Sequence, residues 1–399
     1  MRLLSLSSLI VLPVLSLTIQ AQSVTQICNP VLSNYQTVDS AGQRYAAGQI
    51  AEPPITDHAD GFAWPDTPIG VVKSGDNYEF FASDGGLHFR QFWQGQWYGN
   101  DKWGSATRAV GTLDNPLGTA PPVDVSIQPN PDPAVNPFYA SYNYMGGGPV
   151  YRVPEGMPGA GNLLMVYHAE INTQHNQSFY SVLGLASSTN EGTSWTDLGE
   201  IIRLNQAYRD ELDGFDIGDP PLEISPDGKY FYIYFRDWLA NGTIHWGNTL
   251  TAFSVARAPI SEVFDAAFGA KPHAAAFQKY YAGTWGLQPG IGGYSTDLQP
   301  NAPYAGELQV AYDSYLKRYV MIIGEGVLFA YADSPDGLKW TTPILLKQFE
   351  SSDINTYVMP VGLGDDPHIL GKQFYLFYTY GGPDGWPSNY VGRITLTCI

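Results

Sequence analysis

Three acidic residues stand just before predicted strands, in segments that lie far apart in the chain. They are Asp66, Asp219 and Glu307. Hydrolysis of a glycosidic bond requires two carboxyl groups beside that bond, one protonated and one ionised. When two carboxyl groups lie close together, the charge of one raises the pKa of the other. One group can then stay protonated while the other is ionised. The three residues are therefore candidates for carboxylate chemistry, provided that the fold brings them together.

Each of these acids also has a purely structural interpretation. Asp66 and Asp219 lie within two residues of a proline, and Asx–Pro turns use the Asp side chain to cap the turn. Glu307 is equally compatible with a solvated strand end. Asp216 lies three positions before Asp219 and is a substitute for it. Glu170 follows a predicted core strand, so we expect it on the opposite face of the fold.

Five short runs rich in Tyr, Phe, Val and Ile predict the strands that must position these acids. Most have a second predicted strand before them, and several are followed by a third that ends in a turn. The runs are Tyr78–Ala82, Leu164–His168, Tyr230–Phe235, Tyr319–Ile323 and Phe374–Tyr378. This repeated unit indicates an all-β protein, and we predict a five-bladed β-propeller. The spacing of the runs is irregular, so six or seven blades stay open.

Composition narrows the classes of protein and of partner. The chain has 399 residues, of which 44% are hydrophobic, and this excludes wholesale disorder. Lys and Arg number 20 against 38 Asp and Glu, for a net charge of −18, so we expect no nucleic-acid partner. The 27 Tyr, 10 Trp, 43 Gly and 30 Pro favour β-structure with many turns.

The N-terminal residues 1–21 read as a secretory signal peptide, because Arg2 precedes an apolar run that ends near the small residue Ala21. We expect residues 22–399 to form a single propeller domain that is secreted to the extracellular space. No later segment approaches about 18 continuous apolar residues, so we expect no membrane span.

The chain holds two cysteines, Cys28 and Cys398. In an oxidising compartment they predict a disulfide that ties the first strand to the last and closes a circular fold. Asn176 and Asn241 begin acceptor sequons for N-linked glycans, which fit a secreted glycoprotein.

Two turns carry a recognisable signature. The segments Ser188–Trp195 and Ser334–Trp340 resemble the Asp-box of sialidase-like propellers, with Asn190 at the usual Asp position of the first. In both, a Ser and an Asx residue cap a tight turn, Gly supplies a positive φ, and Trp packs into the blade. These turns mark the fold, and we expect them away from the catalytic end.

A local resemblance points toward a family. Residues 250–290, with VARAPISEVFDAA and FQKYYAGTW, resemble part of a domain of unknown function that occurs in secreted β-propellers, including bacterial endo-D-arabinanases. Ser261–Phe268 within it predicts a short helix. The placement of the three acids is similar to that in five-bladed glycosidases. That resemblance implies Asp66 as base or nucleophile, Asp219 as the orienting or pKa-tuning acid, and Glu307 as general acid.

Aromatic residues in predicted loops fit a carbohydrate partner, because flat rings stack on the apolar faces of sugars. We expect at least half of the chain's loop aromatics to pack between blades instead. The candidates for substrate binding are Trp64, Trp93, Trp97, Tyr144 and Trp285. Gly146–Gly148 and Gly290–Gly293 read as flexible loops, and neither follows a strand and opens a helix, which disfavours dinucleotide binding.

These observations favour a secreted, monomeric glycoside hydrolase that acts on a polysaccharide or glycan without a cofactor. A central Ca²⁺ is compatible with such a funnel, although the sequence specifies no ligands for it, and no histidine pair has metal-ligand spacing.

Two alternatives stay open. A propeller lectin would use the same aromatic residues without catalysis. A polysaccharide lyase would use a His or Tyr to remove a proton beside a uronate carboxylate, which a basic residue must neutralise. Arg90, Arg236 and Arg257 are candidates for that residue, but the net charge of −18 makes an anionic polymer less attractive. The sugar, the linkage and endo or exo action stay open as well.

Overall fold

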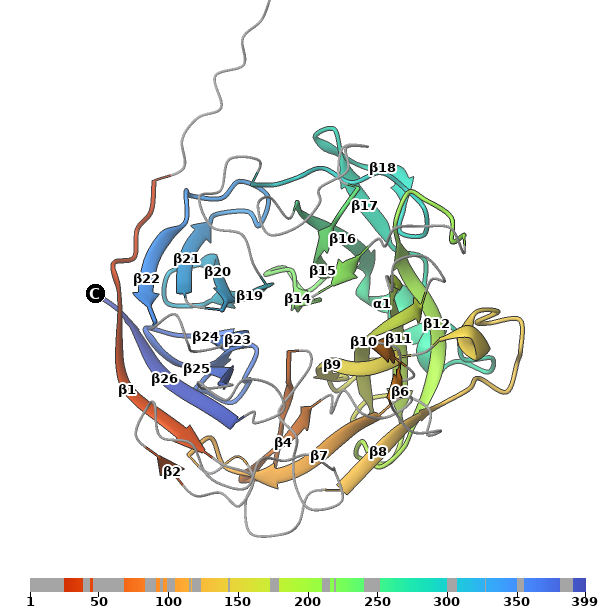
Figure 1. The fold of residues 1–399 in the computed structure, drawn as a ribbon, viewed down its shortest axis with the longest axis horizontal. Coiled ribbons are helices and arrows are strands. Elements are labelled where there is room, and N and C mark those ends of the chain that lie inside the picture. Colours follow the sequence, from red (N-terminus) through yellow and green to blue (C-terminus); the bar gives the residue numbers. More distant parts are fainter. Residues whose placement is uncertain are drawn as a thin grey trace, which may run out of the picture.

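Five blades of antiparallel strands surround a central axis in the computed structural model (Figure 1). The structure describes residues 25–38, 44–45, 68–82, 91–93, 96–98, 105–114, 116, 123–142, 144–172, 179–209, 216–218, 220–239, 252–299, 307–326, 328–349, 355–380 and 390–399. The five-bladed propeller predicted from the strand pattern is therefore confirmed.

Blades I and II belong to one continuous sheet because their outer strands, β8 and β12, pair in parallel. Blade I contains β3 (Gly70–Ser74), β4 (Asn77–Ala82), β7 (Ser105–Gly111) and β8 (Val123–Gln128). Blade II contains β9 (Tyr144–Arg152), β10 (Leu163–Asn172), β11 (Phe179–Ser188) and β12 (Trp195–Arg203), and the 3-10 helix η1 (Tyr139–Ser141) precedes it. A separate hairpin, β5 (Gln91–Trp93) and β6 (Gln96–Tyr98), interrupts the connection from β4 to β7.

Blades III and IV follow the same inner-to-outer order. Blade III contains β13 (Ile217–Gly218), β14 (Leu222–Ile224), β15 (Tyr230–Asp237), β16 (Phe253–Pro259), α1 (Ile260–Phe268), β17 (Gln278–Tyr281) and β18 (Thr284–Pro289). Blade IV contains β19 (Glu307–Asp313), β20 (Arg318–Glu325), β21 (Leu328–Ser334) and β22 (Ile344–Gln348), with β24 (Ile369–Leu370) pairing in parallel with β19.

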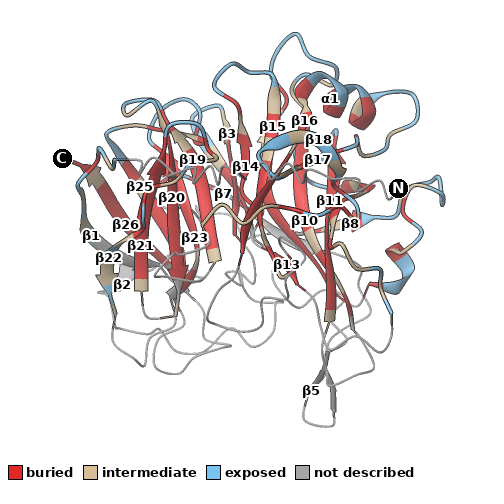
Figure 2. Ribbon diagram, turned by 90° about the horizontal axis from the view of Figure 1, so that it is seen from above, coloured by how far each residue is buried: buried red, intermediate tan, exposed pale blue. Residues whose placement is uncertain are grey.

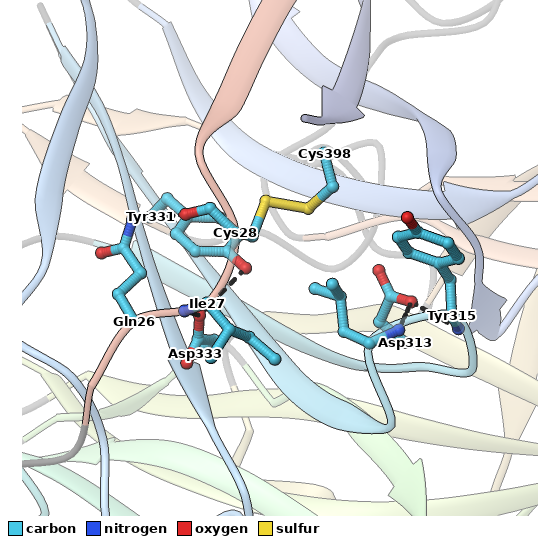
Figure 3. The surroundings of a disulfide bond; sticks show 9 residues. Gln26, Ile27, Cys28, Asp313, Tyr315, Tyr331, Asp333 and Cys398 are labelled. Carbon is cyan, nitrogen blue, oxygen red and sulfur yellow. Dashed lines mark hydrogen bonds between the residues drawn. A yellow bond between two sulfur atoms is a disulfide. The ribbon is translucent and has the colours of Figure 1, made fainter.

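Blade V closes the ring with strands from both ends of the chain. It contains β23 (Asn355–Gly362), β25 (Gln373–Tyr380), β26 (Tyr390–Cys398), β1 (Pro30–Val38) and β2 (Arg44–Tyr45). The predicted disulfide between Cys28 and Cys398 is present, with Cα atoms 5.4 Å apart across 370 positions (Figure 3). The backbone N–H of Ile27 also donates to Asp333 Oδ2 of blade IV at 3.3 Å. The N-terminal segment is thus fixed to two neighbouring blades.

The hydrophobic core lies between the blades, where sheet faces pack against one another. Phe80 of blade I meets Phe377 of blade V edge to face at 6.0 Å, and Tyr234 of blade III meets Tyr319 of blade IV at 6.5 Å. All four rings are buried. Such pairs bury large apolar areas and hold neighbouring blades at a fixed angle.

All five aromatic runs are the second strands of their blades: β4, β10, β15, β20 and β25. The prediction of Gly146–Gly148 as a flexible loop was wrong, because these residues belong to the inner strand β9. A Cβ atom on Gly148 would lie 2.7 Å from the carbonyl oxygen of Val166. The glycines therefore allow the inner strand to approach its neighbour closely.

The axis has two chemically different ends. We call the end where the inner strands β3, β9, β13, β19 and β23 begin the mouth end, and the opposite end the far end. In Figure 2, β13 lies toward one end of the molecule and α1 toward the other. Helix α1 follows β16, the third strand of its blade, and confirms the predicted short helix. None of the described helices is long and apolar enough to cross a membrane.

Both Asp-box turns lie at the far end, since each joins the third and fourth strands of its blade. In the first, Ser188 Oγ accepts the backbone N–H of Gly192 at 3.0 Å, and Trp195 Nε1 donates to the Gly192 carbonyl at 3.1 Å. In the second, Trp340 Nε1 donates to the Gly337 carbonyl at 3.1 Å. The turns therefore act as fold markers away from the mouth end, as the sequence predicts.

Candidate functional site

Glu307 opens the inner strand β19 at the mouth end. Its Oε2 accepts a hydrogen bond from the Thr356 hydroxyl at 2.5 Å and another from the backbone N–H of Tyr357 at 3.2 Å. Both donors belong to β23, the inner strand of the next blade. Two fixed donors orient the Glu307 carboxyl and hold it at the boundary between blades IV and V.

The donor strand is distorted at this point. Tyr357 has a φ of +49°, and the register of β23 against β25 shifts between Thr356 and Met359. A bulky residue with positive φ is uncommon, costs about 1–3 kcal/mol and is typical of functional sites. The bulge thus presents the N–H of Tyr357 to the Glu307 carboxylate rather than to a neighbouring strand.

A second carboxyl group, Asp216, lies at the mouth end of blade III directly before β13. It is 3% exposed. Its Oδ2 accepts from Arg236 Nη2 at 3.0 Å, and its Oδ1 accepts from the Ser181 hydroxyl at 2.7 Å. Asp216 is therefore an ionised carboxylate whose charge is matched inside the protein.

The sequence around Asp216 explains how the pair forms. Gly218 of β13 stands opposite Arg236 of β15 in the sheet. A Cβ atom at Gly218 would lie 2.9 Å from Arg236 Nη2 and 3.3 Å from Asp216 Oδ2. Glycine at this position leaves the space through which the guanidinium reaches the carboxylate.

His168 completes the cluster on blade II. Its Nε2 lies 3.8 Å from Asp216 Oδ1 and makes no hydrogen bond to a described residue. The Tyr144 ring meets the His168 ring edge on at 6.1 Å. Burial lowers the pKa of His168, the charge of Asp216 opposes that shift, and Arg236 adds to it. The imidazole is consequently neutral near pH 7.

The expectation for Glu170 was wrong, because Glu170 lies within β10 and pairs with Tyr144 at the start of β9. The second strand of a blade runs antiparallel to the first, so its last residues return to the end where the inner strand begins. His168 and Glu170 are both brought to the mouth end in this way. Their place at this end was not predicted, because only acids that precede inner strands were expected there.

Several predicted site residues lie outside the described residues: Asp66, Asp219, Trp64, Asn176 and Asn241, together with the segment 1–21. The backbones of Trp93 and Trp97 lie in the β5–β6 hairpin, inserted where β4 ends and β7 begins. That insertion is at the mouth end by strand direction. Tyr144 begins β9 and is buried beside His168.

Trp285 is placed on the outermost strand of blade III. Its ring stacks on Tyr232 at 5.8 Å with planes 10° apart, and the guanidinium of Arg257 lies 4.2 Å from its centre. Arg257 is also 4.1 Å from the centre of the Tyr230 ring. The structure therefore gives Trp285 a packing role and does not bring it to Glu307 or Asp216.

Within the part of the chain that the structure describes, no group of three or more His, Cys, Asp and Glu side chains is arranged to hold a metal ion. The described mouth end instead offers an oriented carboxyl at Glu307 and an ionised, arginine-paired carboxylate at Asp216. A neutral imidazole, His168, stands beside that carboxylate. Such a set can position a hydroxyl-rich ligand and supply acid or base groups to it.

Searches against known proteins define what the chain is similar to. No family model matches it, and no curated protein does. A family 117 glycoside hydrolase of the marine bacterium Zobellia galactanivorans matches with a TM-score of 0.50 and 10% identity, over 92% of this chain and 90% of that one.

Two further solved structures are the catalytic domain of a GH62 α-L-arabinofuranosidase from Coprinopsis cinerea and an exo-β-1,3-galactanase from Phanerochaete chrysosporium. The first has a TM-score of 0.48 and 10% identity over 91% of this chain and 97% of that one. The second has a TM-score of 0.48 and 12% identity over 86% of this chain and 63% of that one. At these identities, the match to the family 117 enzyme shows that the chain has the fold of a glycoside-hydrolase β-propeller.

Proposed function

We propose that the protein is an exported glycoside hydrolase whose reaction takes place at the mouth end of the propeller. Glu307 is the general acid, Asp66 is the base or nucleophile, and the orienting carboxylate comes from the segment that holds Asp216 and Asp219. The substrate is a polysaccharide or glycan, and the protein acts as a monomer without a cofactor.

One observation carries this proposal: acids from distant segments gather at the same end of neighbouring inner strands. Glu307 opens β19, and Asp216 directly precedes β13 in the preceding blade. In the sequence, Asp66 lies four positions before Gly70, the first residue of the inner strand β3, although Asp66 itself is outside the described residues. Carboxyl groups so placed can stand on either side of a glycosidic bond at the axis.

The surroundings of Asp216 suit an orienting role better than that of a base. Both of its oxygens accept hydrogen bonds, and the charge of Arg236 is 3.0 Å away. These contacts fix the position of the carboxyl group. Asp216 therefore supplies a fixed negative charge, while proton transfer falls to Glu307 and Asp66.

A polysaccharide lyase is the second candidate, because a neutral His168 and Tyr144 lie together at the mouth end. Either could remove a proton beside a uronate carboxylate. The basic partner that this reaction needs is Arg236, but Asp216 already offsets its charge. We therefore rank the lyase below the hydrolase.

A panel of neutral and uronic-acid polysaccharides tests the proposal, with reducing ends and ultraviolet absorbance read in parallel. A hydrolase releases reducing ends without new absorbance, whereas a lyase creates an absorbing unsaturated product. The variant Asp66→Asn should lose roughly 10³-fold or more of the activity on the polymer cleaved best. Asp265→Asn, an exposed acid on α1, is the matched control and should keep it.

Two results would overturn the hydrolase. The first is cleavage accompanied by new absorbance, and the second is full activity of Asp66→Asn. Retained sugar binding with no cleavage of any polymer by the unsubstituted protein would identify a lectin instead.

A further inference from the structure

The far end carries a pocket of about 320 Å³ that none of the proposed chemistry uses. Its polar lining comes from the last residues of β3 and β9 and from the turns that follow β9 and β23. These side chains are Lys73, Tyr151, Arg152, Glu155, Asp366 and His368. Prolines and valines complete the wall. The volume falls within the range of small-molecule sites.

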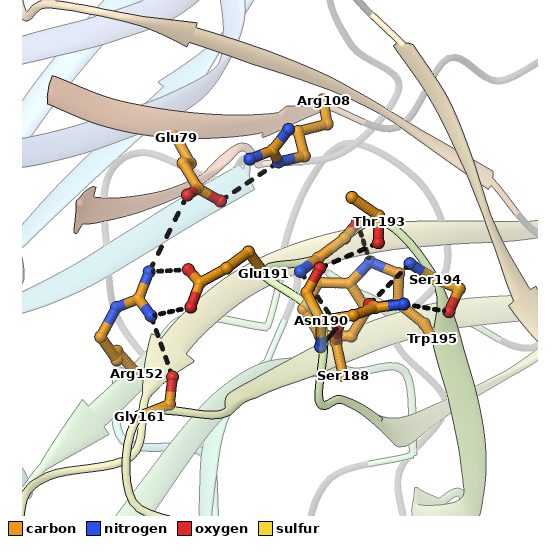
Figure 4. A network of polar contacts seen from close by, with 11 residues as sticks. Glu79, Arg108, Arg152, Gly161, Ser188, Asn190, Glu191, Thr193, Ser194 and Trp195 are labelled. Atoms are coloured by element: carbon orange, nitrogen blue, oxygen red, sulfur yellow. Dashed lines mark hydrogen bonds and ion pairs between the residues drawn. The ribbon is translucent and has the colours of Figure 1, made fainter.

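The wall of this pocket is held in place before any ligand arrives. Arg152 donates to both carboxylate oxygens of Glu191, at 3.2 and 2.8 Å, and to the Gly161 carbonyl at 2.9 Å (Figure 4). Glu191 belongs to the first Asp-box turn, and Glu79 of blade I lies 3.9 Å from the same guanidinium. Arg152 is thus held by Glu191 and Gly161 of its own blade and lies near Glu79 of blade I, and a bidentate arginine of this kind is a rigid part of the pocket.

Polar atoms of the lining lack partners among the described residues. Two buried nitrogen atoms make no hydrogen bond to a described residue: Nε2 of His368, a residue that is 8% exposed, and Nε of Arg152. The half-buried Tyr151 lines the pocket beside them. Groups of this kind that stay unpaired are costly, which favours a ligand rich in hydroxyl groups.

The charges of the lining argue against an anionic ligand. Lys73 lies 2.6 Å from Asp365, and Arg152 lies 2.8 Å from Glu191, so each cation of the lining already stands beside an acid. The lining also holds more acidic side chains than Lys and Arg side chains. Glu155 and Asp366 have no cationic partner among the described residues. Burial, and then the charge of Asp366, raise the pKa of Glu223, whose charge in turn acts on Tyr151.

We propose that this far-end pocket is a second carbohydrate site, which binds one or two residues of a neutral oligosaccharide. The site lies at the opposite end of the axis from Glu307, so it binds sugar without cleaving it. The choice of ligand class agrees with the proposed function but does not depend on catalysis, because binding at the far end is measured without turnover.

Titration calorimetry with the full chain carrying Glu307→Gln tests this site, with cellotriose, β-1,3-galactotriose and trigalacturonate as probes. At least one neutral trisaccharide should bind, and trigalacturonate should not. Adding Glu155→Trp, which fills the pocket from an exposed position, should weaken that binding by about tenfold or more. Tyr151→Phe, which keeps the ring and removes the hydroxyl, should weaken it about two- to tenfold.

Glu262→Trp is the matched control, because Glu262 is an exposed glutamate of α1 at the same end but outside the pocket. It should leave the affinity unchanged. Failure of both neutral probes to bind, a preference for trigalacturonate, or full affinity in Glu155→Trp would overturn the proposal. If the protein cleaves no polysaccharide, these binding results are still valid. The experiment therefore tests the far-end site separately from the proposed hydrolase.

Discussion

The mouth end and the far end of the propeller axis each hold a charge pair, and the two pairs differ in burial. At the mouth end, Asp216 is 3% exposed and is held by Arg236 and Ser181 from neighbouring strands. At the far end, the Asp365 side chain is fully exposed, and its partner Lys73 is about one-third exposed. Buried pairs require partners placed by the fold, whereas exposed pairs exchange readily with water. Burial, and not the end of the axis, therefore separates these two pairs, because the far end also holds a buried carboxylate, Asp333, which lies 2.9 Å from Arg318.

The largest effect on stability should come from breaking the buried pair. In Asp216→Ala, the Arg236 guanidinium, whose side chain is 15% exposed, loses the carboxylate that lies 3.0 Å from its Nη2. We expect the free energy of unfolding to fall by about 3–5 kcal/mol. Urea denaturation measures this change. A loss below about 1 kcal/mol would mean that Arg236 reaches water or another partner, and the contrast between the two ends would then disappear.

A smaller effect should come from the turns of the far end, where backbone conformation rather than charge is decisive. Gly192 of the first Asp-box has φ of +70°, and a Cβ there would lie 2.5 Å from the Phe81 ring. Gly192→Ala should cost about 2–4 kcal/mol from the strained backbone and the clash together.

Gly228 provides the matched control for this turn. It has φ of +68° but open space around the Cβ position. Gly228→Ala should lower the free energy of unfolding by about 1–2 kcal/mol, because only the backbone strain applies at this position. Equal losses in the two variants would show that the contact with Phe81 contributes nothing.

The two ends should also differ in the sign of their pH dependence. Burial, and then the charge of Asp366, raise the pKa of Glu223 well above 4.5 in the folded state. The stability linked to Glu223 is thus complete below about pH 4.5 and falls as the pH rises toward the folded pKa. Glu223→Gln should match the unsubstituted protein at pH 4 and exceed its unfolding free energy at pH 8.

His168 gives the opposite sign, because burial lowers its pKa below 6.5. The stability linked to His168 is present above pH 6.5 and falls as the pH drops toward the lower folded pKa. Urea denaturation of His168→Gln across pH 5–8 measures this contribution against the unsubstituted protein. An advantage of the unsubstituted protein that grows toward low pH would contradict the assignment.

The smallest effect should come from the exposed far-end pair. Lys73→Ala removes the contact with Asp365, which is fully exposed to solvent. We expect no measurable change in the unfolding free energy at physiological salt, because water screens such pairs. A clear loss of stability in this variant would show that the exposed pair at the far end also contributes to the free energy of unfolding.

The sequence predicts the fold well because aromatic runs mark one strand in every blade. These runs are the second strands, which are covered on both faces by neighbouring blades and so are mostly apolar. The inner strand β9 was missed because its residues 144–152 include Gly146–Gly148, which read as a loop. Close packing near the axis requires small residues there, and their composition alone does not distinguish a crowded strand from a flexible segment.

The candidate site is only partly predictable from sequence. Glu307 was found because it immediately precedes an apolar run, and Asp216 was found as a neighbour of Asp219. The pairing of Asp216 with Arg236 depends on the register between β13 and β15, which residue spacing does not reveal. The positive φ of Tyr357 likewise follows from a bulge that its sequence does not signal.

The central claim is that the carboxyl groups of the mouth end cleave a glycosidic bond. The most direct measurement is kcat/KM of Glu307→Gln on the polysaccharide that the unsubstituted protein cleaves best, beside Glu262→Gln as an exposed control. We expect a loss of roughly 10³-fold or more in Glu307→Gln and none in the control. Unchanged turnover in Glu307→Gln, with an unchanged unfolding free energy, would contradict it.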